Sequence, residues 1–310
     1  MEKAKEWSVY LIYYPDEAKK NTAFIEMFQE EGKKQHMHFS FVSIAEYQQR
    51  ELPDVALNRT RIQEVSRWYE KQNIPVFHDS LLTELGNHKG KALFYLKEHL
   101  ADKITKEKWA PETILLEANE LRKQRQKGNT CFYSWLENKM QRKQTGKDWV
   151  IKTAEGHGGR QVSLYSQENA ERLFLQYEGS DFLLQERIES DSKDLRVYIV
   201  GNKVYQAVLR QGKEDFRSNF SLGGKALLYP LSMQELEWIQ DFLDAFSPHI
   251  LGMAGIDFIV TRQGKLIFNE IEEMAGCRML YQNSTYHIVK DYVSWLKSFV
   301  ENNACHSKVK

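Results

Sequence analysis

The chain has 310 residues, of which 42% are hydrophobic and 28% are charged, a balance typical of a globular protein with a sizeable core. Its 43 lysines and arginines equal its 43 aspartates and glutamates, which excludes a global field favouring nucleic acid or a membrane surface. No apolar run reaches the roughly 20 residues that span a bilayer, and three widely spaced cysteines without metal-type spacing indicate a cytoplasmic protein.

Residues 1–87 alternate between β-type and amphipathic helical segments, which predicts a small α/β domain with a largely parallel sheet. The N-terminal apolar stretch lacks a small-residue cleavage site, so we interpret it as the first strand and not as a signal peptide. A turn-rich stretch at residues 85–91 is expected to end the domain. The expected strands are residues 7–14, 38–44, 54–60 and 74–79, with helices at 21–35 and 61–73.

Residues 88–183 are expected to form a second, central subdomain. Its last helix should begin after a capping serine, Ser166, and stop at Gly179. Two basic stretches in it are interpreted as solvated helix faces, with a docking surface for an acidic partner as the alternative. The expected elements are helices at 91–100 and 166–179, strands at 110–118, 148–153 and 161–165, and basic stretches at 120–129 and 138–147.

Residues 184–310 are expected to form the third part, a C-terminal subdomain built on two hairpins. Gly201-Asn202 predicts the turn of the first hairpin, and Gly264 predicts that of the second. Residues 215–230 are expected to be irregular. The expected elements are a strand at 181–188, hairpins at 190–211 and 253–274, and helices at 233–246 and 286–301.

The second hairpin carries three carboxylates in otherwise apolar strands. Glu270 and Glu272 leave the same face of their strand, and a turn near Gly264 would bring Asp257 opposite them. Such a cluster is costly unless a cation lies within it, and hard oxygen ligands favour magnesium or calcium. The alternative is a solvent-facing side of an edge hairpin that binds no metal.

A single lysine, Lys152, ends a β-type run and is followed by a glycine-rich stretch that contains Gly156, Gly158 and Gly159. Glycines let backbone amides approach a polyphosphate, and a lysine supplies a point charge to it. An ordinary hairpin turn is the alternative. His157 in this stretch is interpreted as a solvent-exposed loop residue, with proton transfer as the other interpretation.

Arginines lie in strands that otherwise read as apolar. Arg196 and Arg210 therefore each need an anion, either a carboxylate or a phosphate. With Arg217, they could pair with the three carboxylates or stabilise a transferring phosphoryl group.

Taken in order, the lysine strand, the glycine loop, "LLQERI", "KDLRVYIVG", "DFRSN", "GIDFIV" and "FNEIEEMAG" resemble the ATP-grasp superfamily. The similarity is greatest to its RimK-like branch, the carboxylate–amine ligases typified by an enzyme that adds glutamate to a ribosomal protein. The resemblance extends over nearly the whole chain and includes "LNRTR" and "IPVFHDSLLTELGNHKGK". It implies a small α/β domain followed by two subdomains that clamp ATP.

The resemblance also implies a role for individual residues. Lys152 and one lysine of "GNHKGK", Lys89 in preference to Lys91, would contact the nucleotide phosphates. The remaining nucleotide-binding residues would be Gly156, Gly158, Gly159, Gln185, Glu186, Ile188, Asp194 and Arg196; Arg210, Arg217 and Asn219 would face the γ-phosphate and the incoming carboxylate, and Asp257, Glu270 and Glu272 would bind magnesium.

One position departs from the family pattern, which has Glu-x-Asn where this chain has Glu270-Ile271-Glu272. Glutamate still offers oxygen ligands, but with an extra negative charge. Asn269 is out of phase with the pair in a regular strand and is a poor substitute. In the first domain, Arg59 and Arg61 are candidates for binding a carboxylate, with surface ion pairs as the alternative.

The expected activity is therefore an ATP-dependent ligation of a small carboxylate, an amino acid or dicarboxylate, to an amine through an acyl phosphate. Magnesium is the expected cofactor, and manganese can substitute. The alternatives are a nucleotide-binding protein without ligase chemistry and a ligase for a protein- or carrier-bound substrate. The amphipathic helices are compatible with a homodimer.

Overall fold

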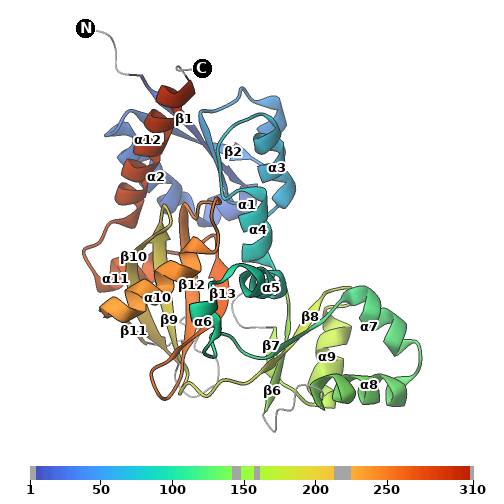
Figure 1. Ribbon diagram of the computed structural model, residues 1–310. Helices are drawn as coiled ribbons and strands as arrows, with labels where there is room; N and C mark the ends of the chain where they lie inside the picture. Colours follow the sequence, from blue (N-terminus) through green and yellow to red (C-terminus); the bar gives the residue numbers. More distant parts are fainter. Residues whose placement is uncertain (1–4, 142–147, 157–160, 213–224, 308–310) are drawn as a thin grey trace.

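The computed structural model describes residues 5–141, 148–156, 161–212 and 225–307, which form three β-sheets with helices packed around them (Figure 1). One sheet belongs to the first domain, one to the central subdomain and one to the third part. The predicted fold class, a small parallel α/β domain followed by two sheet-based subdomains, is confirmed. In the described part of the chain, no helix is long and apolar enough to cross a membrane.

The first sheet is parallel, with the strand order β2-β1-β3-β4. Strand β3 is buried along its whole length, as expected for a central parallel strand. The chain winds from β1 to β2 on one side and then passes to β3 on the other. The elements are β1 (Trp7–Tyr13), α1 (Pro15–Lys20), α2 (Thr22–Lys33), β2 (Met37–Ser43), the 3-10 turn η1 (Tyr47–Gln49), β3 (Val55–Asn58), α3 (Gln63–Lys71) and β4 (Val76–Phe77).

The prediction of a turn-rich stretch at residues 85–91 is wrong, because two helices meet there. The side chain of His88 caps the second helix by accepting a hydrogen bond from a backbone N–H at 3.1 Å. Gly86 lies inside the first helix. A Cβ at this position would come within 2.4 Å of a Glu273 carboxylate oxygen, so only glycine fits there. The glycine therefore marks close packing and not a turn. The two helices are α4 (Ser80–Asn87) and α5 (Lys89–His99).

The second sheet is antiparallel, with the order β5-β8-β6-β7. Side chains alternate along β6 (Trp149–Thr153), so Ile151 enters the core under the helices while Lys152 lies on the opposite face. The predicted capping serine is confirmed, since Ser166 Oγ accepts from Asn169 N at 3.1 Å. The other elements are β5 (Thr113–Leu116), α7 (Ala118–Arg125), α8 (Asn129–Gln141), β7 (Val162–Leu164), α9 (Gln167–Gln176) and β8 (Phe182–Glu186).

The third sheet is antiparallel, with the order β11-β10-β9-β12-β13. Gly201 and Asn202 form the predicted turn, each with a φ of 59°. Residues 225–229 form an edge strand where irregular chain is expected. These residues lack a clear alternation of apolar and polar side chains, and their pairing with β10 holds them in the sheet. The elements are α6 (Asp102–Thr105), β9 (Lys193–Val200), β10 (Lys203–Gln211), β11 (Lys225–Tyr229), α10 (Met233–Asp244), β12 (Met253–Val260) and β13 (Leu266–Glu272).

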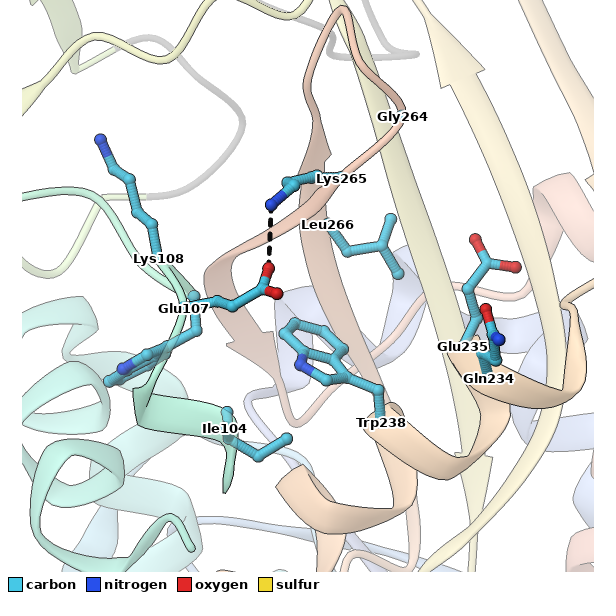
Figure 2. A pocket seen from close by; sticks show the side chains of 10 residues that line it. Ile104, Glu107, Lys108, Gln234, Glu235, Trp238, Gly264, Lys265 and Leu266 are labelled. Carbon is cyan, nitrogen blue, oxygen red and sulfur yellow. Dashed lines mark hydrogen bonds and ion pairs between the residues drawn. The ribbon is translucent and has the colours of Figure 1, made fainter. Parts of the chain in front are cut away.

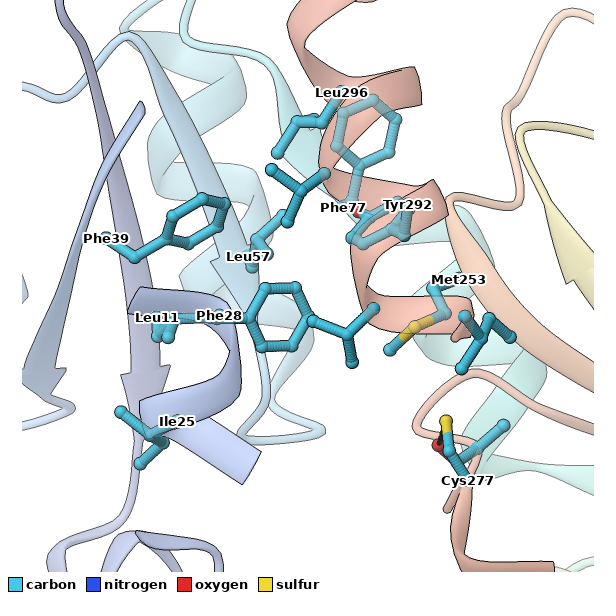
Figure 3. Close-up of a cluster of buried hydrophobic side chains, with 14 of the residues drawn as sticks. Leu11, Ile25, Phe28, Phe39, Leu57, Phe77, Met253, Cys277, Tyr292 and Leu296 are labelled. Atoms are coloured by element: carbon cyan, nitrogen blue, oxygen red, sulfur yellow. Dashed lines mark hydrogen bonds between the residues drawn. The ribbon is translucent and has the colours of Figure 1, made fainter. Parts of the chain in front are cut away.

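The chain ends with α11 (Arg278–Asn283) and α12 (Ile288–Ser307), and α12 packs against α2 of the first domain. Figure 3 shows the hydrophobic cluster at this contact, in which the rings of Phe28 and Tyr292 lie 6.1 Å apart, edge to face. The first domain and the third part therefore share one core.

The central subdomain has a core of its own. Among the described residues, that core draws on positions between Ile114 and Leu184. Residues 88–110, which the sequence analysis assigns to this subdomain, instead bury Leu93 and Trp109 in the core of the third part. The sheet that carries Lys152 is thus packed separately from the rest of the chain.

Candidate active site

The hairpin of β12 and β13 places two of the three predicted acidic residues opposite each other. Asp257 pairs across the strands with Glu270. The register then shifts, because the next pair is Phe258 with Phe268, and this leaves Asn269 outside the strand pairing. The hairpin therefore contains a β-bulge at the middle of the site.

The bulge corrects the expectation that Asn269 is out of phase with the acidic residues. Phe268 and Ile271 both enter the core behind the hairpin, so Asn269 and Glu270 between them both lie off that core. Lys152 Nζ lies 3.4 Å from Asn269 Oδ1. The Asn269 amide is thus part of the site. The regular alternation of side chains along a strand does not predict this, because it takes no account of an inserted residue.

Two arginines and two aspartates form a buried ion network on the third sheet. Asp257 accepts hydrogen bonds from Arg196 Nε at 2.8 Å, from Arg196 Nη2 at 2.7 Å and from Arg210 Nη2 at 2.7 Å. Arg210 also donates to both oxygens of Asp194, at 2.5 and 2.6 Å. Of the two alternatives left open by the sequence, these arginines pair with carboxylates.

The network is electrically balanced and stays ionised. Burial alone would raise the pKa of Asp257, but Arg196 and Arg210 hold it well below its usual range. Burial opposes the charge of Arg210, but Asp257 and Asp194 raise the pKa of its guanidinium. Since each ion is compensated by another, the loss of one member would leave an uncompensated buried charge.

Lys89, and not Lys91, reaches the site. Lys89 lies at the start of α5, where its Nζ donates to the carbonyl of Gly156 and lies 3.0 Å from Glu270 Oε2. Lys91 Nζ instead pairs with Glu84 Oε1 at 2.5 Å and is half-exposed. The structure thus favours Lys89 as the lysine that stands beside the acidic hairpin.

Lys152 lies on the facing sheet and is fully buried. Its hydrogen-bond partner is the neutral Asn269, and among the described residues no carboxylate lies within ion-pair distance. Burial, followed by repulsion from Lys89, lowers the pKa of Lys152 to about 8 against a weaker effect of Glu270. Within the described ranges, this cation therefore has no anion in direct contact with it.

The glycine-rich stretch is described only at its start. A Cβ on Gly156 would lie 2.1 Å from Gln161 Oε1 and 2.5 Å from Thr153 Oγ1, so the turn leaves no room for a side chain. Thr153 Oγ1 and Gln161 Oε1 are joined by a 2.6 Å hydrogen bond. Five candidate residues lie outside the described residues: His157, Gly158, Gly159, Arg217 and Asn219.

Three of the predicted nucleotide-binding residues lie at or after the end of β8. Gln185 pairs with Val150 across the sheet, on the same face as Lys152, and its Nε2 donates to Thr113 Oγ1 at 3.0 Å. Glu186 alternates to the other face, where Lys108 donates to it. Ile188 follows the strand and is half-buried.

Lys108 also lines a separate pocket of about 240 Å³ between α6, α10 and the β12–β13 turn (Figure 2). Across this pocket Lys265 Nζ pairs with Glu107 Oε2 at 2.9 Å. The residues that line this pocket include neither Lys89 nor Lys152.

The end of β13 holds an acidic side chain that the sequence analysis does not single out, Glu273. It is buried, and its oxygens accept no hydrogen bond from the described residues. Burial, followed by the neighbouring Glu272, raises its pKa to about 7. Arg61 lies 3.3 Å from Glu272 and 3.7 Å from Glu273. In the sequence, the only indication of a role for Glu273 is that it directly follows Glu270 and Glu272 in a short acidic stretch.

The oxygen-rich hairpin fits a hard cation only together with further ligands. In the part of the chain that the structure describes, no three His, Cys, Asp or Glu side chains cluster as a metal site. Asp257, Glu270 and Glu272 instead each contact a basic side chain. Magnesium commonly takes one or two protein carboxylates and completes its shell with phosphate oxygens. The donors therefore suit a cation that arrives with a nucleotide.

The family model for a RimK-like ATP-grasp domain matches residues 114–296. The chain belongs to the RimK-like ATP-grasp family. The matched range of this ATP-grasp chain contains Lys152, the arginine–aspartate network and the bulged hairpin, whereas Lys89 and the first domain lie before it.

A probable alpha-L-glutamate ligase from Xylella fastidiosa (strain M12) is 35% identical over 167 residues, which cover 50% of this chain and 54% of that protein. The chain thus spans about half the length of the curated relatives that it matches.

Two solved structures resemble nearly the whole chain. D-cycloserine synthetase DcsG has a TM-score of 0.68 at 11% identity, covering 94% of this chain and 99% of that one. The ATP-grasp ligase PsnB, solved with a minimal precursor, Mg and ADP, has a TM-score of 0.62 at 11% identity, covering 97% and 99%. At such identities the likeness shows a shared fold.

Proposed function

We propose that this protein is an ATP-dependent carboxylate–amine ligase that works through an acyl phosphate. The observation that carries the proposal is the meeting of two sheets with unequal charge. Lys89 and Lys152 converge on the bulged hairpin at Glu270 and Asn269, and Lys152 has no compensating anion among the described residues. A polyphosphate held between the sheets would supply the missing negative charge.

The proposed reaction has two steps. An oxygen of the substrate carboxylate attacks the γ-phosphorus, the bond to the β,γ-bridging oxygen breaks, and ADP leaves. The amine nitrogen then attacks the acyl carbon, inorganic phosphate leaves, and the amine loses a proton. No nucleophilic side chain is required, so the protein contributes positioning and charge neutralisation.

The chain's own residues would divide this work by position. Lys89 and Lys152 would neutralise the phosphates, with the Gly156 backbone beside them. Arg210 is held by Asp194 and Asp257, and we propose on the family pattern that it lies beside the γ-phosphate and positions it, with its charge already compensated. Gln185, Glu186, Ile188, Asp194 and Arg196 remain proposed nucleotide-side residues, and Gly158, Gly159, Arg217 and Asn219 are proposed on the family pattern alone.

Asp257, Glu270 and Glu272 would hold magnesium, or manganese in its place, which would draw charge from the phosphate oxygens. Asn269 joins this set as a neutral oxygen donor, because the bulge places it beside Glu270. We infer that Glu272 exchanges its contact with Arg61 for the cation when the nucleotide binds.

The substrate class rests on the relatives. The curated proteins named probable alpha-L-glutamate ligases support L-glutamate as the first substrate to test. PsnB, which was solved with a minimal precursor, supports a second candidate, a carboxylate carried on a peptide. We infer that the reaction takes place in the cytoplasm. A nucleotide-binding protein without ligase chemistry is the alternative.

The test is phosphate release from magnesium ATP with hydroxylamine as a surrogate amine, over a panel of amino acids, dicarboxylates and peptides. Hydroxylamine traps an acyl phosphate whatever the natural amine is. We expect a carboxylate-dependent signal that is lost in Glu270→Gln and retained in Glu107→Gln, because Glu107 pairs with Lys265 and not with Lys89 or Lys152. Silence across the panel in protein that still binds ATP would support the alternative.

A further inference from the structure

Arg59 lies where the winding of the first sheet reverses. It follows β3 directly, and its backbone N–H donates to the carbonyl of Ile12 in β1 at 2.9 Å. Strands β1 and β3 are neighbours, but the chain leaves β1 first towards β2, on the other side. In open parallel sheets, ligands bind outside the carboxyl ends of the strands at such a reversal.

The guanidinium of Arg59 is held by aromatic rings. Its centre lies 5.4 Å from the ring centroid of Phe24 and 6.0 Å from that of Tyr13. Its Nε lies 3.3 Å from Tyr13 Oη. These contacts fix the plane of the side chain but use one of its five N–H donors.

The two terminal nitrogens of Arg59 remain available. Among the described residues they have no hydrogen-bond partner, and no carboxylate lies within 4 Å of the side chain. The residue as a whole is half-buried. Arg61, two residues later, differs because Glu272 and Glu273 already neutralise it.

Arg59 lies at the contact between the first domain and the third part. The rings that hold its guanidinium, Tyr13 and Phe24, belong to the same hydrophobic cluster as Cys277, which follows the acidic hairpin. Glu273, at the end of the bulged hairpin, interacts electrostatically with Arg59. Arg59 therefore lies at the junction between the first domain and the end of the acidic hairpin.

We propose that Arg59 binds a carboxylate of the substrate that does not react, and so selects amino acids or peptides that carry this second acidic group. A planar fork with two free nitrogens matches a carboxylate in a bidentate contact. The proposal takes the reaction from the proposed ligase function, but the binding of the carboxylate can be measured without turnover.

The test is calorimetric binding to the full chain with magnesium and a non-hydrolysable ATP analogue. The probes are L-glutamate, glutarate, the dipeptide Glu-Glu, and the amides L-glutamine and L-isoglutamine. We expect one of the two amides to bind about 10- to 100-fold more weakly than L-glutamate. Arg59→Gln should weaken the binding of L-glutamate by a similar factor and leave the affinity for that amide unchanged.

Arg67→Gln is the matched control, since Arg67 is an exposed arginine of the same domain. It should bind every probe as the wild type does. If Arg59→Gln does not fold, Arg59→Lys keeps the charge without the fork and should lose affinity for L-glutamate while binding the ATP analogue normally.

Binding of the acidic probes that is equal in wild type and Arg59 variants overturns the proposal, as does a wild type that binds none of them. Failure of the ligase function is a different result. In that case carboxylate binding would still depend on Arg59, but no carboxylate would stimulate phosphate release.

Discussion

The two sheets that face each other in the ATP-grasp part treat buried positive charge in opposite ways. On the third sheet, Arg196 and Arg210 are bonded to Asp257 and Asp194, so the charges are compensated before any ligand arrives. On the central sheet, Lys152 is buried beside another lysine and bonds only to an amide among the described residues. The charges on the third sheet are thus compensated before a ligand binds, whereas the charge on the central sheet is not.

The difference teaches where binding energy can be gained. A compensated network holds its geometry and gains little from an added anion, because its charges are already paired. A desolvated lysine without a partner gains charge compensation when a phosphate enters. The separate hydrophobic core of the central subdomain keeps the uncompensated central sheet apart from the compensated third sheet.

The largest effect is expected from breaking the compensated side. Asp257→Asn removes the negative charge that Arg196 and Arg210 share and leaves them without full compensation. We expect a loss of about 3–5 kcal/mol in the free energy of unfolding, as for other broken buried ion pairs, and no measurable ligation. Urea unfolding and the hydroxylamine assay check both. Unchanged stability would show that the network is not the compensated unit described above.

The lysine that accompanies Lys152 at the hairpin is tested by a pair of lysines on one helix. Lys89→Met should weaken ATP binding by about 10- to 100-fold, because a charge-assisted contact to phosphate is lost. Lys91→Met should change it less than about twofold, since Lys91 pairs with the half-exposed Glu84. Calorimetry with ATP and magnesium measures both. Equal effects of the two changes would contradict the assignment of Lys89 to the site.

A smaller effect concerns protons. Free protein holds Lys152 with a pKa of about 8, and a bound polyphosphate should raise that pKa because it favours the charged form. ATP binding at pH 8 should therefore take up a fraction of a proton, and affinity should fall as pH rises above 8. Calorimetry in buffers of different ionisation heat measures the uptake. Lys152→Arg, charged throughout, should bind ATP without it.

The smallest effect extends the comparison to the contact between the first domain and the third part. His78 is buried there and accepts from Gly252 N at 3.1 Å, and burial, followed by Arg59, lowers its pKa to about 3. The unfolded chain binds this proton near pH 6.5, so stability should be complete above that pH and fall below it. Between pH 7 and 5.5 the loss from this group should be about 1 kcal/mol.

Urea unfolding at several pH values measures this loss against His78→Gln, which cannot take up the proton. The variant should show a shallower decline than the wild type over the same range. Parallel declines in the two proteins would mean that His78 titrates normally in the folded state.

Much of the fold could be predicted from local patterns. Alternating strands, the Gly201-Asn202 turn and the Ser166 cap all depend on neighbouring residues, and all are present. The misses have non-local causes. Strand β11 is held by pairing with its neighbour β10. Gly86 does not form a turn but allows close packing against Glu273, which is distant in the sequence.

For the site, the sequence by itself determined which chemical groups are present: two lysines, paired arginines and an acidic hairpin in a recognisable order. Only the tertiary structure decided which of them are compensated. It separated Lys89 from Lys91 and placed Asn269 beside Glu270 through a bulge. It also left Arg59 without a carboxylate partner among the described residues. The physical reason is that charge compensation depends on distances across strands and domains, which no spacing along the chain encodes.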